Sequence, residues 1–161
     1  MSTFEDLGYK WRETYFVLFD SARRPKLDDV KQKLAKLNPR FELSEGEADD
    51  QARFESLTLR APQDYAAMDI SYQSGDEVAE QVAELQKEMK GSIDPADRPK
   101  FAQMARCDAK FDILHFEQVT DAQEEEEGGE MLDPSALLSV MDALVELTGG
   151  VGVDPQSGSL M

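Results

Sequence analysis

Short continuous apolar runs alternate along this chain with segments whose apolar residues repeat every three or four positions. A continuous apolar run is typical of a strand that is buried on both faces, and the three-to-four repeat is typical of an amphipathic helix. In chain order these patterns predict strand, helix, strand, strand, helix, strand, helix and a short hairpin. The 161 residues are therefore expected to form one mixed domain, spanning 1–161.

The first strand is predicted at residues 14–20 (TYFVLFD), which are rich in aromatic and β-branched side chains. The first helix is predicted from the spacing of Leu27, Val30, Leu34 and Leu37. It is expected to end before Pro39, because the residue preceding a proline is pushed out of the helical region. The charged segment 42–50 (ELSEGEADD) is predicted to be an exposed loop.

Segments 53–60 and 65–72 are predicted to form an antiparallel hairpin, since only a short turn separates them. The remaining elements follow from the same patterns. They are a second helix with Val78, Val82, Leu85 and Met89 on one face, two helical turns at 101–107, a strand at 110–119, a mobile acidic loop at 120–130, a helix containing Leu137, Leu138, Met141 and Leu144 that begins at Asp133-Pro134, and a hairpin at 151–161.

The first six elements fit the ferredoxin-like β-α-β-β-α-β plan, in which two helices cover one face of an antiparallel sheet. The predicted fold class is therefore α+β and ferredoxin-like, extended by a C-terminal helix and a short hairpin. The expected core residues are Phe16, Leu18, Leu34, Leu57, Ile70, Val82, Leu85, Ile113, Leu138 and Leu144.

The charge is strongly negative and unevenly spread. The formal net charge is −17, and the last 51 residues hold twelve acids and no lysine or arginine. This balance disfavours binding to nucleic acid or to an anionic membrane. A single cysteine, no readable secretory signal and no apolar stretch long enough to span a bilayer lead us to expect a cytoplasmic protein; its oligomeric state is not indicated.

His115 and Cys107 are the residues best suited to catalysis. His115 is the only histidine, and alternation along its strand places it on the same side as Phe111 and Ile113, which favours partial burial. Cys107 has no Cys-x-x-Cys partner and only Arg106 nearby to lower its pKa, so an inert thiol is expected. No metal site and no cofactor are predicted, because no ligand spacing or phosphate-binding motif is present.

Two charged stripes follow helical spacing. Glu77, Glu80, Glu84 and Glu88 form an acidic stripe on the second helix, and Lys26, Lys33, Lys36 and Arg40 form a basic stripe on the first. A ferredoxin-like plan lays these helices side by side, so one interpretation is that the stripes pair within the protein. The other is that the acidic stripe, together with Glu124, Glu125, Glu126 and Glu127, is an external binding face.

These observations support one leading hypothesis and one alternative. The leading hypothesis is a non-enzymatic acidic interaction module, of the immunity- or inhibitor-protein kind, that binds a basic protein partner. The alternative is a small enzyme or ligand-binding domain with a pocket near Cys107 and His115, because catalytic groups can converge from distant positions in the sequence.

Overall fold

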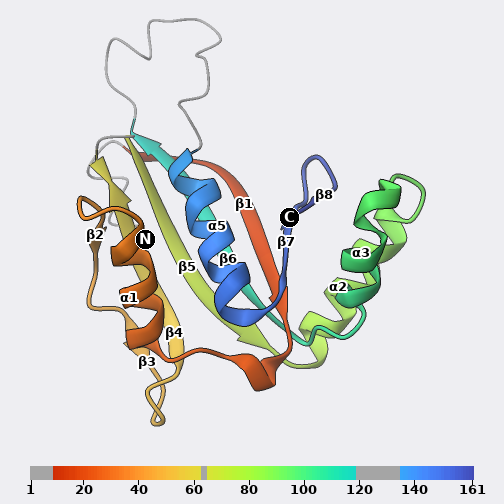
Figure 1. Cartoon of the computed structure of the whole chain (residues 1–161), viewed down its shortest axis with the longest axis horizontal. Coiled ribbons are helices and arrows are strands. Elements are labelled where there is room, and N and C mark those ends of the chain that lie inside the picture. The colour runs from red at the N-terminus through yellow and green to blue at the C-terminus, as the bar shows by residue number, and fades with distance from the viewer. Residues whose placement is uncertain (1–8, 63–64, 119–134) are drawn as a thin grey trace, which may run out of the picture.

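The computed structural model describes residues 9–62, 65–118 and 135–161, which form an α+β structure around one antiparallel sheet (Figure 1). The strands are β1 (Tyr9–Phe19), β2 (Glu42–Leu43), β3 (Glu47–Ala48), β4 (Phe54–Ala61), β5 (Ala66–Ser74), β6 (Ala109–Gln118), β7 (Val151–Asp154) and β8 (Ser159–Leu160). The helices are α1 (Leu27–Leu37), α2 (Asp76–Met89), α3 (Arg98–Met104) and α5 (Ser135–Thr148), with short 3-10 turns at Ser21–Arg23 and Pro95–Asp97.

The sheet has the strand order β2-β4-β5-β6-β1-β7-β8, and β3 also pairs with β4. The strands β4, β5 and β6 form a meander, and β1 adds to its end by pairing with β6 along almost its whole length. β7 pairs with β1 only at Phe16, Val17 and Leu18, and it pairs with β8 on its other side. All the pairings among the described residues are antiparallel.

This strand order differs from the expected ferredoxin-like plan, although the α+β class and the antiparallel sheet are confirmed. In that plan the first strand lies between the third and fourth strands, and both helices cover one face. Here β6 lies between β5 and β1, and β7 occupies the other side of β1. The order of elements along the chain is compatible with both arrangements, because it does not specify which strands become neighbours.

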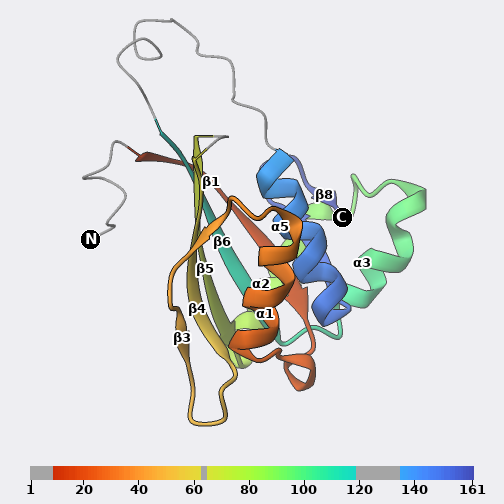
Figure 2. The same cartoon turned by 60° about the vertical axis from the view of Figure 1, so that its left-hand side comes forward.

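One face of the sheet, the helix face, packs against α1 and α5 and holds the main core. Figure 2 shows these two helices side by side along the sheet. Phe111 is fully buried there, with its ring centroid 4.7 Å from that of Phe19 and 5.1 Å from that of Phe54. Val30 and Leu34 of α1 complete the packing. Strand β1 is apolar at successive positions because both of its faces are buried. Val17 and Phe19 face the helix-face core, and Leu18 is buried on the opposite face of the sheet.

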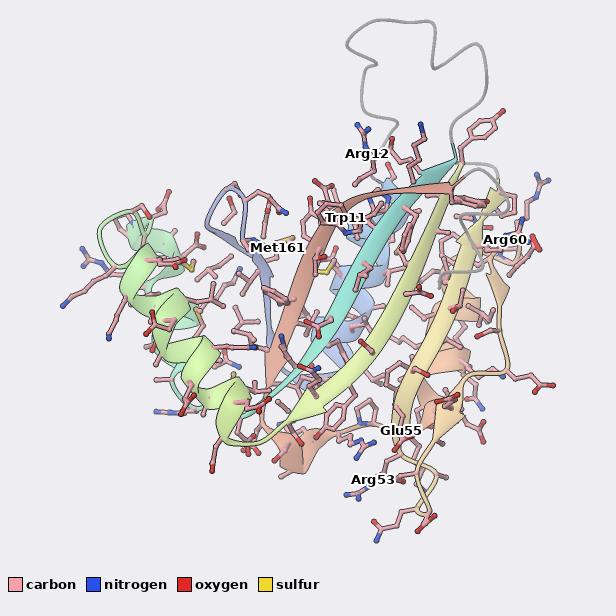
Figure 3. The ribbon with its side chains drawn as sticks, turned by 180° about the vertical axis from the view of Figure 1, so that it is seen from behind. Trp11, Arg12, Arg53, Glu55, Arg60 and Met161 are labelled. Atoms are coloured by element: carbon pink, nitrogen blue, oxygen red, sulfur yellow. The ribbon has the colours of Figure 1, made fainter. Side chains whose placement is uncertain are left out.

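The opposite side of the sheet, the open face, is covered only near one edge. There α2 and α3 pack through Val78, Val82 and Met104 against Leu18 of β1 and the apolar side chains of β7 and β8. Figure 3 looks onto this face and shows both helices gathered beside β1 and β7, while β6, β5 and β4 carry no helix. In the described part of the chain, none of the helices has the length and apolarity that a bilayer crossing requires.

Most of the expected elements are present, with two corrections. Segment 42–50 was expected to be a loop, but it contains β2 and β3, which add to the edge of β4. Leu138 was expected in the core, but it is 42% exposed, whereas Leu137 and Leu144 are buried. Because α5 has apolar residues on nearly every side, its sequence does not show which side faces the core. The acidic loop at 120–130 and the helix start at Asp133-Pro134 lie outside the described residues.

Two glycines end α5, as the sequence indicates. Gly149 has a φ of +67° and its N–H donates to the Val145 carbonyl at 2.8 Å, which closes the last helical turn. A Cβ at Gly150 would collide with the backbone carbonyl oxygen of Leu18. These two positions let the chain turn from α5 directly into β7 and lie close against β1.

Candidate functional site

The acidic stripe of α2 lies beside the apolar side of the helix. Val78, Val82 and Met89 are buried against the sheet edge, while the four glutamates of the stripe are exposed. Asp76 and Glu77 stand in the first turn, where carboxylates interact favourably with the positive end of the helix dipole. The same spacing that forms the helix therefore places the acidic stripe next to the open face.

A groove of about 610 Å³ runs between α2 and the open face, and we call it the α2 groove. Its base combines β1 and β6 with the apolar side of α2, and Phe16 and Leu85 are only partly buried in it. The acidic stripe of α2 forms one side of the groove. The lining residues are Phe16, Leu18, Glu77, Val78, Glu80, Gln81, Val82, Glu84, Leu85, Glu88 and Lys110. All four glutamates of the predicted stripe are thus brought to one concave surface.

Lys110 is the one basic residue that lines this groove, and its charge is already balanced. The residue is 6% exposed, and its Nζ lies 2.9 Å from Oδ1 of Asp112, two positions along β6 on the same face. The ammonium group also lies 4.6 Å from the centre of the Phe16 ring, within the range of a cation–π interaction. Lys110 and Asp112 therefore form a compact ion pair at the base of the groove.

The glutamates of the α2 groove are almost unpaired. Glu84 lies 3.8 Å from Lys87 across one exposed turn, and Glu77, Glu80 and Glu88 have no ion pair among the described residues.

The interpretation that the acidic stripe pairs with the basic stripe of α1 is wrong. The two helices lie on opposite faces of the sheet, and Lys33 of α1 instead pairs with Glu146 of α5 at 2.8 Å.

The open face continues beyond the groove as a polar surface. A second hollow, of about 700 Å³, lies over β4 and β5 and is lined by Ser56, Thr58, Asp69, Ser71, Leu114 of β6 and the β2–β3 connection around Glu45. The Thr58 hydroxyl donates to Oδ1 of Asp69 at 2.7 Å. The uncovered part of the sheet thus combines hydroxyl and carboxylate groups over β4 and β5 with a small apolar cluster formed by Tyr9, Ala67, Leu114 and Phe116.

No metal centre is formed by the described residues: none of their His, Cys, Asp and Glu side chains come together in a group of three or more suited to a metal ion. The other predicted acidic cluster, Glu124 to Glu127, lies outside the described residues.

Cys107 is buried at the C-terminal end of α3. Its Sγ lies 3.5 Å from the Gln103 carbonyl oxygen, to which the thiol donates. Burial, reinforced by the nearby Asp20 and Asp108 carboxylates, raises the pKa of the thiol to about 11. Because the thiolate is the reactive form, this environment suits an inert cysteine.

His115 belongs to a different part of the molecule, on the helix face. It is 2% exposed, and its Nδ1 lies 3.7 Å from Oε1 of Glu13, which also accepts a 3.0 Å hydrogen bond from the Tyr15 hydroxyl. Burial lowers the pKa of His115, so the neutral imidazole is favoured. Glu117, also buried, lies 3.4 Å from Arg12, and burial raises the pKa of its carboxyl.

The structure does not bring His115 and Cys107 together. Cys107 lies just before β6 and packs with α2 and α3, whereas His115 lies six residues along β6 from Ala109 and points to the helix face. Six residues of strand span about 20 Å. The expected position of His115 beside Phe111 and Ile113 agrees with the observed strand register.

Sequence reasoning missed the part of the groove that comes from the sheet. Phe16 and Leu18 were expected simply as core residues, and Lys110 was not singled out. The available signal was a lysine and an aspartate, Lys110 and Asp112, two residues apart in an otherwise apolar strand. That spacing predicts a shared face, but only the sheet order places the face beside α2.

Comparison of this chain with known protein families, with curated proteins and with solved structures found no match. The proposal below therefore depends on the geometry of the chain itself.

Proposed function

We propose that this protein is a non-enzymatic interaction module, of the immunity- or inhibitor-protein kind, whose α2 groove binds a basic protein partner. The observation that carries the proposal is the convergence of Glu77, Glu80, Glu84 and Glu88 on one open groove with partly exposed apolar side chains at its base. Interfaces of this composition combine an apolar centre with a charged rim.

Apart from Glu77 in the first turn of α2, the acidic stripe has no evident role in holding the fold together. Like charges four positions apart on a helix cost about 0.2–0.5 kcal/mol per pair, and Glu80, Glu84 and Glu88 form two such pairs. Among the described residues the only neutralising contact is the exposed Glu84–Lys87 pair. The repulsion among Glu80, Glu84 and Glu88 slightly destabilises α2. Binding of a positively charged surface therefore explains these glutamates better than a contribution to stability does.

The charge of the groove predicts how binding proceeds. An acidic, concave surface accelerates the approach of a basic partner over long distances. Exposed ion pairs add little affinity, so the attraction acts mainly on the association rate. Association should slow steeply between about 0.01 M and 0.15 M salt, because the Debye length falls from about 30 Å to about 8 Å.

The proposal is tested with a nine-residue oligolysine titrated into the ¹⁵N-labelled protein while amide chemical shifts are recorded. We expect the largest shifts at residues 77–88 of α2 and at Phe16–Leu18 of β1. The E77Q/E80Q/E84Q/E88Q variant should lose most of this response. Its matched control removes four exposed acids on other surfaces, in the variant D28N/D29N/D50N/D142N.

The two variants separate a defined site from general electrostatics, because both change the net charge by four. Equal weakening in both would contradict the proposal, as would shifts spread over all the acidic surfaces. The unfolding free energy of each variant, measured in urea, shows whether its fold is retained.

The alternative function, an enzyme or ligand-binding pocket built on both Cys107 and His115, is not supported, because the hollow of about 440 Å³ that Cys107 lines does not include His115. The two side chains lie in separate clusters, and burial keeps the thiol protonated and the imidazole neutral at pH 7.

A further inference from the structure

The α2 groove is lined by side chains, and its base offers no free strand edge. Phe16, Val17 and Leu18 of β1 are paired with β6 on one side and with β7 on the other. Strand β6 is itself paired with both β1 and β5. A segment that enters the groove therefore cannot extend the sheet there by adding a strand.

This arrangement restricts the backbone conformation of the occupant. Backbone N–H and C=O groups that leave water without a hydrogen-bond partner carry a substantial free-energy penalty. An extended peptide pressed into the groove would leave part of its backbone without partners, because neither β1 nor β6 can supply them. A helix satisfies its own backbone and presents only side chains to the groove.

The side chains of the groove define the chemistry of that helix. Phe16 and Leu85 present apolar surface at the base, while the acidic stripe runs from Glu77 to Glu88, about 16 Å along the axis of α2. We infer that the α2 groove receives an amphipathic helix of a basic protein, with apolar side chains on Phe16 and Leu85 and a flanking row of lysine or arginine facing the stripe. This inference rests on the proposed function.

A second copy of this chain does not meet these requirements through its own basic helix. The helix α1 carries Lys26, Lys33 and Lys36, but its apolar residues Val30 and Leu34 are fully buried against the sheet. The one apolar side chain that α1 leaves exposed is Leu37 in its last turn, at 40%. A single leucine at the end of the helix does not match the two apolar side chains at the base of the groove, so a helix of a different protein fits it better.

The inference is tested with three synthetic peptides of about 14 residues, four helical turns, of which the first two contain the same numbers of leucine and lysine. The first places leucine at helical spacing, and the second alternates leucine and lysine at strand spacing. The third keeps the helical spacing but replaces one central lysine by proline. Dissociation constants come from calorimetry, and peptide helicity comes from circular dichroism of the mixtures. We expect the first peptide to bind at least tenfold more tightly than the other two.

Variants of the protein locate the binding. L85Q should weaken the first peptide at least fivefold, while L138Q, which changes an exposed leucine on α5, should leave its dissociation constant unchanged. The E77Q/E80Q/E84Q/E88Q variant should weaken all three peptides, and the D28N/D29N/D50N/D142N control should retain them. If L85Q is poorly folded by its urea transition, F16L provides the second test of the groove base.

The outcomes distinguish the helix inference from the proposed function. Equal affinities for the helical and strand-patterned peptides, both reduced by loss of the acidic stripe, would overturn the helix inference and leave the function standing. Affinities that fall equally in the stripe variant and its control would overturn both. Saturable binding of the helical peptide at a stoichiometry other than one, unaffected by L85Q, would also overturn the inference.

Discussion

The two faces of the sheet differ in the side chains they carry and in how they are covered. The helix face is apolar along most of β4, β5 and β6, and α1 and α5 cover it. The open face is apolar near β1, β7 and β8, where α2 and α3 pack, and in a small cluster of Tyr9, Ala67, Leu114 and Phe116. Over the remaining strands it carries Thr58, Asp69, Ser71 and Asp112, alternating in sequence with the core residues.

This difference separates folding from binding within one structure. The residues that fill the helix face are buried and contact one another, so changes there should act on stability. The α2 groove lies at the boundary between the covered and uncovered parts of the open face, where apolar and acidic side chains are both accessible. Changes to the exposed glutamates there should act on binding, with small effects on stability, whereas the buried Lys110 at the base contributes to both.

The largest expected effect is on the helix face. F111A removes a fully buried ring that contacts Phe19 and Phe54, and it should lower the unfolding free energy by about 3–5 kcal/mol. L85A in the α2 groove should cost about 1 kcal/mol, because Leu85 is already partly exposed. Urea unfolding followed by circular dichroism measures both. Similar losses in the two variants would show that the faces are not energetically distinct.

A smaller effect is expected at the base of the groove. K110M keeps the aliphatic stem but removes the cation that lies 2.9 Å from Asp112, so it should cost about 1.5–3 kcal/mol. The double variant K110M/D112N removes both charges and should recover part of this loss. K110M should also speed association of the oligolysine probe, because it makes the groove more negative. A slower association would contradict the assigned electrostatics.

His115 and Glu117, both buried on the helix face, should make the unfolding free energy depend on pH in opposite directions. Burial lowers the pKa of His115 below its ordinary value of 6.5, so the unfolded chain takes up this proton first and acidification below about pH 6.5 favours unfolding. Burial raises the pKa of Glu117 above its ordinary value of 4.5. The native state therefore takes up this proton first, and acidification toward pH 4.5 favours folding.

Single variants separate these two contributions. H115N should lose less stability than the wild type on acidification below about pH 6.5, while E117Q should lose more on acidification toward pH 4.5. Urea titrations at several pH values give the slopes, which should diverge in opposite directions from the wild type. Parallel slopes for all three proteins would show that neither group is coupled to folding.

The smallest effect concerns Cys107, beneath α3. With a pKa of about 11 and a buried side chain, its thiol should react slowly with iodoacetamide at pH 7.5, and the reaction should accelerate on unfolding in urea. The rate should be unchanged when the oligolysine probe occupies the α2 groove. Rapid alkylation of the native protein would indicate that α3 opens frequently and that this edge of the open face is less stable than proposed.

Much of the local structure could be predicted from the sequence. The spacing of Leu27, Val30, Leu34 and Leu37 defined α1, and Val78, Val82 and Met89 defined the buried side of α2. The alternation along β6 placed His115 beside Phe111 and Ile113. These features depend on periods of 3.6 and 2 residues, which neighbouring positions in the chain determine by themselves.

The tertiary structure decided which surfaces became neighbours. The acidic stripe was visible as a spacing of glutamates, but whether it would face α1, solvent or a groove depended on the positions of α2 and β1. Leu138 was misplaced for the same reason, since α5 is apolar on several sides and only its packing selects one. Strand neighbours and helix faces arise from contacts between segments far apart in the sequence, and local periodicity carries no information about those contacts.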